Sequence, residues 1–344
     1  MKKSSKLAAL LLALVMVLSL CACSGDSESE NSAPAGDEAS APAAGPSESG
    51  GKVYQVGISQ YVTHPALDAA TEGFIAAMND RLGEDGWTYD LQNAAEDIPT
   101  CGTIANSFVS KKVDLIMANA TPALQAAAAA TGDIPILGTS VTEYGVAFSI
   151  DDFSGTVGGN ISGTSDLAPL DQQAAMIKEW YPDAETVGLL YCSKEANSQY
   201  QVDTVQKYLE DLGYKCKQYA FSDSNDIAAV CQSANDNSDV IYIPTDNSAA
   251  ANTPVIDNIC RGNTPVFCGE ENICAGCGVA TLSISYYDIG YKTGEMAADI
   301  LVNGADISTM PVQYAPEFVK KYNPTICADL GIDAPGGYEA IEVE

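Results

Sequence analysis

The chain has 344 residues and contains 16 Lys and Arg against 46 Asp and Glu, which gives a formal net charge of -30. A chain this acidic cannot build the basic patches that nucleic acids and anionic membrane faces require, so we expect no nucleic-acid partner. The part that follows residue 51 is long enough to divide into two domains.

The N-terminus has the pattern of an export signal. Three lysines within the first six residues precede an apolar run at 7–20, which is too short to span a bilayer comfortably. The run ends in Leu-Cys-Ala-Cys, which resembles a bacterial lipobox with Cys23 as the acylated residue. We therefore predict a lipoprotein signal peptide at 1–23 and lipidation of Cys23.

The next segment, 24–51, consists mainly of Ser, Ala, Gly, Pro and acidic residues and has no aliphatic periodicity. Such a segment cannot bury enough apolar surface to fold, so we predict a disordered tether. A tether behind a lipidated cysteine holds a soluble domain near a membrane without inserting it. The predicted location is therefore extracytoplasmic and lipid-anchored to the cell membrane.

Strand and helix patterns alternate after the tether. The first series has strand patterns at 53–59, 88–92, 113–118 and 134–138, and helix patterns at 65–82, 103–111 and 122–130. The second series has helix patterns at 171–180, 196–212, 226–235 and 249–261, and strand patterns at 186–191, 215–221, 240–243 and 265–268. Repeated βαβ units of this kind predict parallel sheets.

Four further patterns follow the second series: strands at 279–284 and 311–315, and helices at 289–302 and 324–330. They would be surplus in an isolated second lobe, so we expect the chain to recross and complete both lobes. The predicted fold class is α/β, with two Rossmann-like lobes of parallel sheet joined by a multi-strand hinge. The predicted N-terminal lobe is 52–167 plus 285–312, and the C-terminal lobe is 168–284 plus 313–344.

The cysteines favour no cofactor chemistry. Two of the eleven fall in the predicted signal region, and the remaining nine cannot all pair within the chain. Cys274 and Cys277 form a CxxC motif, but the single histidine, His64, is far away in sequence and no second close cysteine pair completes a zinc site. We favour a structural or incidental thiol pair, then a loop disulfide, and a metal site last. Neither metal nor cofactor is expected.

Catalytic motifs are missing from the sequence. It has no G-x-S-x-G, no P-loop, no G-x-G-x-x-G and no H-E-x-x-H. His64 precedes a proline at a predicted helix start, where capping or ligand contact suits it better than acid-base catalysis. We therefore expect a binding protein and not an enzyme.

The turns after the predicted strands are the candidate binding positions, because open α/β sheets bind ligands beyond the carboxyl ends of their strands. Thr121 stands at a helix start with Pro122 behind it, and it either caps that helix or helps free N–H groups to hold a carboxylate. Asp246 follows the strand at 240–243 and either caps a helix or pairs with an ammonium group. Glu270 is a weaker case of the same kind.

Six segments carry a resemblance to a known family. They are His64-Pro65-Ala66-Leu67-Asp68 with Gly73-Phe74, Ala120-Thr121-Pro122-Ala123, Gly163-Thr164-Ser165-Asp166, Glu195-Ala196-Asn197-Ser198, Pro244-Thr245-Asp246-Asn247 and Tyr286-Tyr287-Asp288-Ile289-Gly290. Together they make residues 53–330 resemble the ABC substrate-binding family that includes tryptophan- and tyrosine-binding lipoproteins, of the type I periplasmic-binding fold. The family often has Asp-Pro shortly after its fourth strand, where this chain has Thr-Glu-Tyr, so Tyr144 is free to fill the pocket or to stack there.

The resemblance implies a solute-binding lipoprotein that captures a small ligand, an aromatic amino acid in many members, and presents it to the permease subunits of an ABC importer. We expect it to act as a monomer. On this basis Thr121 holds the ligand carboxylate and Asp246 its ammonium. The complete set of predicted ligand-binding residues is Ser59, Tyr61, Thr121, Pro122, Ala123, Ser140, Tyr144, Ser165, Glu195, Asn197, Ser198, Asp246, Asn247 and Glu270.

Two other functions remain open at this level. A sugar or nucleoside binder of the same fold would use planar polar side chains and aromatic stacking in place of the charged pair. A sensor lipoprotein would report its ligand to a receptor and not to a permease.

Overall fold

The structure is a computed structural model that describes residues 52–342. The predicted signal peptide, the tether and Cys23 lie outside the described residues. Within 52–342 no helix combines the length and the apolar character needed to cross a membrane.

The first sheet has six parallel strands in the order β11-β5-β4-β3-β1-β2. Its strands are β1 (Tyr54–Gln60), β2 (Trp87–Asn93), β3 (Leu115–Asn119), β4 (Ile136–Thr139), β5 (Ile161–Ser165) and β11 (Gln313–Tyr314). The helices of this lobe are α1 (Pro65–Leu82), α2 (Ile98–Lys111), α3 (Thr121–Ala130), α4 (Tyr144–Phe148) and α11 (Tyr286–Asn303), with a short 3-10 helix at Ile307–Thr309.

Helices cover both faces of this sheet, as the strand sequences require. Successive side chains of a strand point to opposite faces, and in β3 Ile116 packs with α2 and α3, whereas Leu115 and Met117 pack with α1 and α11. All of these side chains are fully buried, so β3 is apolar without alternation.

The second sheet has seven strands in the order β13-β12-β10-β9-β8-β6-β7, parallel throughout except for the antiparallel β10–β12 pair. The strands are β6 (Thr186–Cys192), β7 (Lys215–Phe221), β8 (Val240–Ile243), β9 (Val266–Cys268), β10 (Ala280–Ser283), β12 (Val319–Tyr322) and β13 (Glu339–Ala340). The helices are α5 (Leu170–Trp180), α6 (Ala196–Asp211), α7 (Ile227–Asn237), α8 (Asn247–Ala251), α9 (Thr253–Cys260), α10 (Glu271–Cys277) and α12 (Pro324–Leu330). The two apolar layers of this lobe lie on opposite faces of the sheet.

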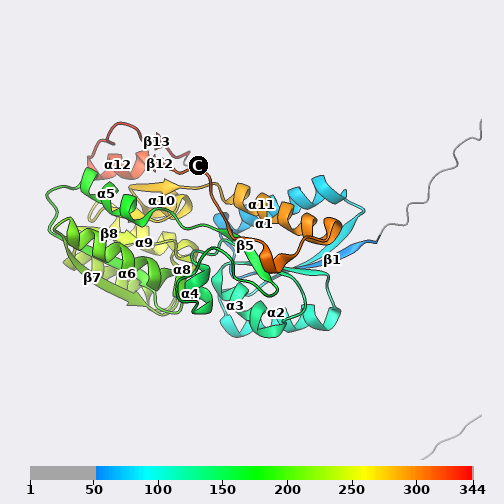
Figure 1. Ribbon diagram of the computed structural model, residues 1–344. Helices are drawn as coiled ribbons and strands as arrows, with labels where there is room; N and C mark the ends of the chain where they lie inside the picture. The colour runs from blue at the N-terminus through cyan, green and yellow to red at the C-terminus, as the bar shows by residue number, and fades with distance from the viewer. Residues whose placement is uncertain (1–51, 343–344) are drawn as a thin grey trace, which may run out of the picture. The chain divides into compact units, whose positions relative to one another are not determined.

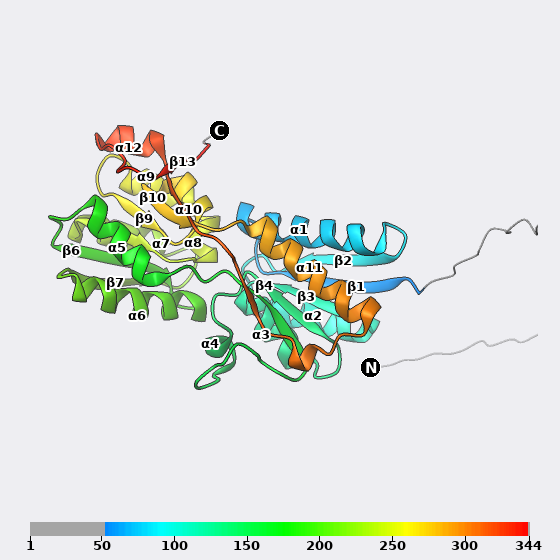
Figure 2. The same cartoon turned by 45° about the horizontal axis from the view of Figure 1, so that its top comes forward.

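The chain passes between the two sheets three times, between β5 and α5, between β10 and α11, and between β11 and β12. These crossings run through the middle of the ribbon in Figures 1 and 2. The α/β fold class with two lobes and parallel-rich sheets is therefore confirmed. One detail differs from the predicted boundary at 312: Gln313 and Tyr314 pair with β5, so the chain leaves the first sheet after them.

Several elements differ from the sequence patterns for local reasons. α2 begins at Ile98 because the Asp97 carboxylate accepts a hydrogen bond from Thr100 N and caps the helix there. The single helix predicted at 249–261 is two helices, since Pro254 lacks the N–H that would continue α8 into α9. β5 was not predicted, because its sequence ISGTS has a single aliphatic residue.

The backbones of helices α1 and α11 approach each other very closely, because glycines lie at the contact between the two helices. A Cβ on Gly290 would stand 1.9 Å from the Ala70 carbonyl oxygen, and one on Gly73 would stand 2.1 Å from the Tyr287 carbonyl oxygen. This packing fixes α11, whose N-terminal end is the second crossing, against the first lobe.

Candidate functional site

The predicted residues of the first lobe gather at one edge of its sheet. Ser59 lies near the end of β1, Thr121 follows β3, Ser140 follows β4, and Ser165 ends β5. The four strands are parallel neighbours in the order β5-β4-β3-β1, so these residues lie side by side, with strands about 4.8 Å apart. The edge formed by the carboxyl ends of these strands is called the first-lobe rim below.

The backbone of the rim is unusual at two positions. Ala120 has φ 88° and ψ 157°, a conformation that side-chain-bearing residues rarely adopt, and Ser140 has φ 54°. Ala120 is the N-cap of α3, so Thr121 is the first residue within the helix and does not cap it, contrary to one of the two roles considered from the sequence. Pro122 and Ala123 complete the buried first turn.

Polar atoms without partners mark the rim. Ser59 Oγ, Thr121 Oγ1 and Ser140 Oγ are all buried and have no hydrogen-bond partner among the described residues. Buried hydroxyls are nearly always hydrogen-bonded in folded proteins, and each one left unpaired is costly. Three such groups on adjacent strand ends are an arrangement suited to a polar ligand.

Glu195 organises the facing edge of the second lobe, where β6 leads into α6. Its carboxylate is fully buried and accepts bonds from the backbone N–H groups of Asn247 (3.2 Å) and Ser248 (2.9 Å). It also accepts from the Asn247 Nδ2, Ser248 Oγ and Asn197 Nδ2 atoms, at 2.6, 2.9 and 3.2 Å. Glu195 therefore ties α6 to α8. Asn197 Oδ1 is buried and has no hydrogen-bond partner within residues 52–342.

Asp246 is the N-cap of α8. One carboxylate oxygen accepts from Ala249 N (2.8 Å) and the other from Cys192 N (2.6 Å), which joins the ends of β8 and β6. Burial, with Glu195 nearby, raises the pKa of Asp246 to about 8. Both oxygens thus have partners inside the protein.

Glu270 and Ser198 occupy similar positions at helix starts. Glu270 caps α10 and accepts from Asn272 N (2.8 Å) and Ile273 N (2.6 Å). Burial raises the pKa of its carboxyl to about 7. Ser198 is fully buried in the first turn of α6.

His64 and Asn247 connect the two lobes directly. His64 Nε2 lies 3.2 Å from Asn247 Oδ1. The Asn247 amide nitrogen donates to Glu195, so its oxygen is the acceptor and His64 Nε2 carries the hydrogen. Burial lowers the pKa of His64, which keeps the ring neutral, and its Nδ1 is buried without a partner.

The two tyrosines predicted to bind ligand, Tyr61 and Tyr144, lie in the core of the first lobe. The Tyr61 hydroxyl donates to Glu96 O (3.2 Å) and the Tyr144 hydroxyl to Thr164 O (3.1 Å). The Tyr144 ring lies where Gly138 and Gly163 leave space for it. Tyr144 is thus packed into the core with its polar end bonded to the backbone.

Asp166 is not among the fourteen predicted site residues, although it belongs to one of the six segments that carry the family resemblance. Asp166 follows β5 on the rim, is 4% exposed, and has one carboxylate oxygen without a partner. The available signal was its position directly after a strand end.

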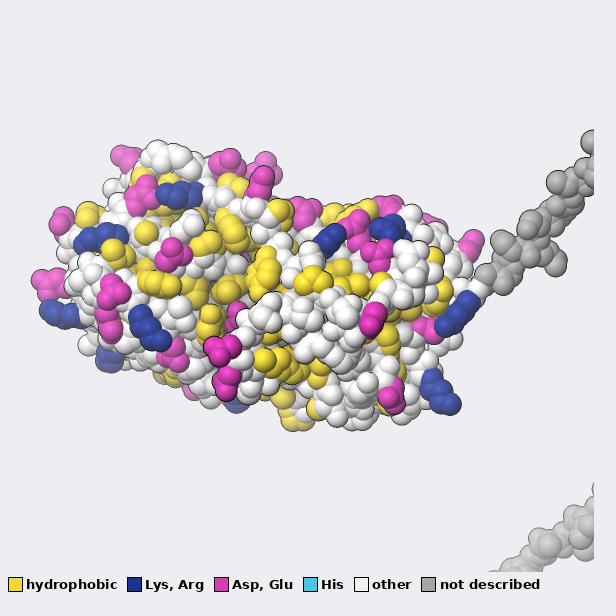
Figure 3. All heavy atoms as spheres, in the orientation of Figure 1, with side chains coloured by type: hydrophobic (Ala, Val, Ile, Leu, Met, Phe, Trp, Pro, Cys, Tyr) yellow, Lys and Arg dark blue, Asp and Glu magenta, His cyan; other side chains and the backbone are white. Residues whose placement is uncertain are grey.

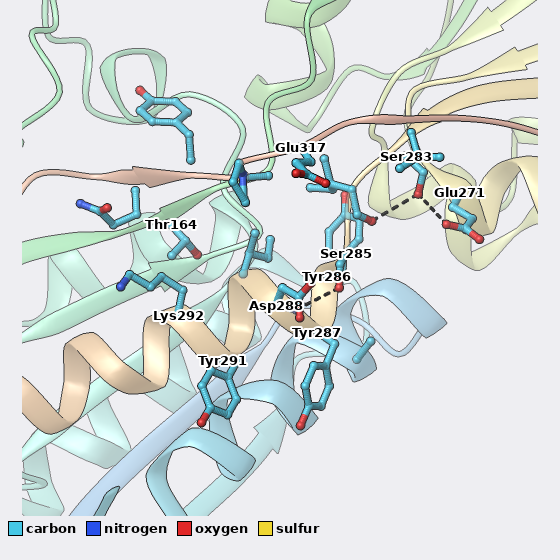
Figure 4. Close-up of a pocket in the computed structure, with 18 of the residues that line it drawn as sticks. Thr164, Glu271, Ser283, Ser285, Tyr286, Tyr287, Asp288, Tyr291, Lys292 and Glu317 are labelled. Atoms are coloured by element: carbon cyan, nitrogen blue, oxygen red, sulfur yellow. Dashed lines mark hydrogen bonds between the residues drawn. The ribbon is translucent and has the colours of Figure 1, made fainter. Parts of the chain in front are cut away.

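An open cavity among the described residues lies elsewhere. It has a volume of about 930 Å³ and is lined by the N-terminal half of α11 and by the β10–α11 and β11–β12 crossings. Figure 4 shows its lining, in which Ser283 donates to Glu271 (2.5 Å). Glu271 in turn pairs with Lys321 (2.8 Å). None of the fourteen predicted residues lines this cavity, and all fourteen are buried or nearly so.

Cys274 and Cys277 are buried at the C-terminal end of α10 within the apolar core of the second lobe. No group of His, Cys, Asp and Glu among residues 52–342 is arranged to hold a metal ion. On the face of the molecule drawn in Figure 3, Lys and Arg side chains stand apart from one another among acidic ones.

Comparisons with known proteins agree on one family. Residues 55–340 match the family model described as ABC transporter substrate binding protein. The chain is 38% identical over 267 residues to a tyrosine-binding protein of Clostridioides difficile (strain R20291), covering 76% of each chain.

Two solved structures are similar over most of the chain. An ABC domain from Streptococcus pneumonia in complex with L-Trp has a TM-score of 0.80 at 29% identity, with 84% of this chain and 100% of that chain covered. A ligand-free, open substrate-binding protein with adhesive properties from Clostridium difficile has a TM-score of 0.65 at 38% identity, with 85% and 100% covered.

Proposed function

Since the chain belongs to the ABC transporter substrate-binding protein family, we propose that it captures an aromatic amino acid outside the cell membrane and delivers it to the permease of an ABC importer. Solute binding follows from the family, and the protein is not an enzyme. The amino-acid ligand, the permease partner and the anchor on Cys23 are the parts that we propose.

The observation that carries the proposal is the set of unpartnered polar atoms on the first-lobe rim. Ser59, Thr121 and Ser140 present three buried hydroxyls on neighbouring strand ends. Asn197 Oδ1, on the second lobe, is also buried without a partner. A small ligand with several polar groups would satisfy them together.

The relatives support an aromatic amino acid in particular. One is a tyrosine-binding protein and another was solved with L-Trp bound. Sugars and nucleosides remain competing ligands, and the binding experiment below separates them.

Capture by closure fits the connections between the lobes. Three crossing segments form a hinge, and His64 meets Asn247 across the lobes. The structure superposes better on the L-Trp complex than on the open, ligand-free protein, although its sequence is closer to the latter. This difference favours a closed arrangement, in which a ligand would be removed from water.

A thermal-shift panel of the common amino acids, sugars and nucleosides tests the ligand class. A true ligand at about 100 times its Kd adds roughly 2.7 kcal/mol to the free energy of unfolding. We expect L-Tyr or L-Trp to raise Tm and the sugars and nucleosides to leave it unchanged. A shift with a sugar or nucleoside alone would reject the amino-acid assignment.

The anchor and the delivery step need a separate experiment in cells. Replacement of Cys23 by Ser should move the protein from the membrane fraction to the soluble fraction without changing the Kd of the released protein. Uptake of labelled ligand should require both this protein and a permease. Ligand-dependent signalling without uptake would instead indicate a sensor.

A further inference from the structure

Asp166 stands at the first crossing between the lobes, in the segment that joins β5 to α5. Its Oδ2 accepts a hydrogen bond from the Tyr286 hydroxyl (3.0 Å), which comes from the second crossing at the start of α11. Its Oδ1 is buried and has no partner among the described residues. Asp166 is 4% exposed, so bulk water has little access to this oxygen.

No cationic side chain within 52–342 forms an ion pair with this carboxylate. The ion pairs among residues 52–342 do not include Asp166. The titratable groups that influence it or its Tyr286 partner are Tyr144 on α4, Tyr286 on α11, Glu195 before α6 and Glu270 before α10, and none of them is positive. A buried, unpaired carboxylate is unfavourable, and burial raises the pKa of Asp166 to about 6.

The other buried carboxylates of the interlobe region differ from Asp166 in the number of their oxygens that accept hydrogen bonds. Asp246 and Glu270 each use both oxygens to accept backbone N–H groups, and Glu195 accepts bonds from α8 on both oxygens. Asp166 alone among these four has an oxygen that forms no hydrogen bond of normal geometry with the described residues, although the Thr142 side chain and the backbone N–H of Asp166 lie near enough to lower its pKa.

The neighbours of Asp166 on the rim complete the pattern. Ser140 follows the adjacent strand β4 and Thr121 follows β3, one strand further on. The strand ends that carry these two residues thus lie about one and two strand spacings, each of about 4.8 Å, from the end of β5. An α-amino acid carries its ammonium and carboxylate on a single carbon, so its two charged ends can reach an acid at β5 and hydroxyl donors at β4 and β3.

We propose that Asp166 binds the ammonium group of the ligand through Oδ1, while the hydroxyls of Ser140 and Thr121 hold the ligand carboxylate. This assignment rests on the proposed amino-acid ligand and replaces Asp246, which serves as a helix cap. The ligand ammonium supplies the positive charge that the protein itself does not place beside Asp166, and the pair forms where water is excluded.

Asp166→Asn tests the assignment, because the amide oxygen can still accept from Tyr286 while the charge is gone. The Kd values of wild-type and variant protein are measured by calorimetry for L-Tyr and for 3-(4-hydroxyphenyl)propanoate, which lacks the ammonium. We expect the variant to bind L-Tyr at least about 30-fold more weakly and to bind the analogue as well as the wild type does, or better. If L-Trp is the tighter ligand, L-Trp and its analogue without the ammonium group are used in place of L-Tyr and its analogue.

Asp226→Asn is the matched control. Asp226 accepts backbone N–H groups from Ser222 and Asp223, outside the rim. This variant removes the same charge and should leave both Kd values unchanged.

The pH dependence in the wild type gives a readout that needs no variant. Only the ionised form of Asp166 pairs with an ammonium, so L-Tyr affinity should rise by up to about tenfold per pH unit below pH 6 and level off above about pH 7. The analogue should show no such rise.

The outcomes separate the two proposals. No binding of any amino acid by wild-type protein overturns the proposed ligand class. If wild-type protein binds L-Tyr or L-Trp but Asp166→Asn loses equal affinity for the ligand and for the analogue, the role of Asp166 is overturned and the ligand class stands. The same holds if the affinities for ligand and analogue have the same pH profile.

Discussion

Single polar side chains of the first lobe differ in whether the folded protein supplies their hydrogen-bond partners, and this difference predicts their roles. Thr121 Oγ1 is buried without a partner, so in the absence of ligand it contributes a desolvation cost. Thr293 is equally buried but bonds to Thr164 Oγ1 (2.8 Å) and Ile289 O (2.9 Å). The first threonine is therefore available to a ligand and the second is part of the fold.

Thr121→Val should change stability and affinity in opposite directions. The methyl group keeps the shape and removes an unsatisfied hydroxyl, so the free energy of unfolding without ligand should stay equal or rise slightly. Ligand affinity should fall by about 1 kcal/mol, roughly fivefold, because one hydrogen bond is lost. Urea unfolding and calorimetry measure the two quantities.

Thr293→Val is the control for this prediction, and it should lower the free energy of unfolding because it leaves the Thr164 hydroxyl short of a partner. A Thr121→Val protein that is destabilised and binds ligand with unchanged Kd would show that the hydroxyl has a structural role.

At the scale of elements, the close packing of α1 on α11 determines how the second crossing is held. Gly290 and Gly73 permit backbone approach that no side chain tolerates. Gly102 in α2, by contrast, has open space around its Cβ position.

Gly290→Ala should lower the free energy of unfolding by at least about 2 kcal/mol, because the added methyl meets the Ala70 carbonyl oxygen and the helices must separate. The matched change Gly102→Ala should raise it by up to about 1 kcal/mol through helix propensity. Urea unfolding of both variants checks this, and a neutral Gly290→Ala would mean that α11 shifts without cost.

The sequence predicted most elements because their signals are local. The start of α3 was visible in Thr121-Pro122, and the parallel sheets followed from alternating strand and helix patterns. The sequence could not show that Asp166 has an oxygen without a partner. That feature depends on Tyr286, 120 residues away, whose hydroxyl bonds to one carboxylate oxygen only. The second partner of Asp246 is likewise remote, since Cys192 belongs to another strand.

At the scale of the whole molecule, buried acids link stability to pH. Burial raises the pKa of Asp166 to about 6, of Glu270 to about 7 and of Asp246 to about 8. Between pH 4 and these pKa values the three carboxyls stay protonated in the folded protein and ionise in the unfolded chain. Their contribution to the free energy of unfolding is therefore complete below about pH 4 and is lost as the pH rises through 6 to 8.

The ligand-free protein should therefore be less stable at pH 8 than at pH 5, by at least about 2 kcal/mol in urea unfolding. His64 acts in the opposite direction, since burial lowers its pKa and its contribution is lost as pH falls below 6.5, but three acids outweigh it. Equal stability at both pH values would contradict the raised pKa values. Saturating amino acid should reduce the difference, because a bound ammonium favours ionised Asp166.

The covering of α1 by α11 also has a consequence for biosynthesis. Roughly two hundred residues separate the two helices in the chain, and strands β6 to β10 of the second lobe are synthesised between them. Until α11 emerges, the apolar layer around Phe74 and Met78 of α1 is incomplete, because it lacks Met296 and Ala297. A nascent chain stopped before residue 286 would thus expose part of this apolar layer to chaperones and proteases. The first lobe, although its first strands are translated early, is therefore not complete before α11 and β11 are made.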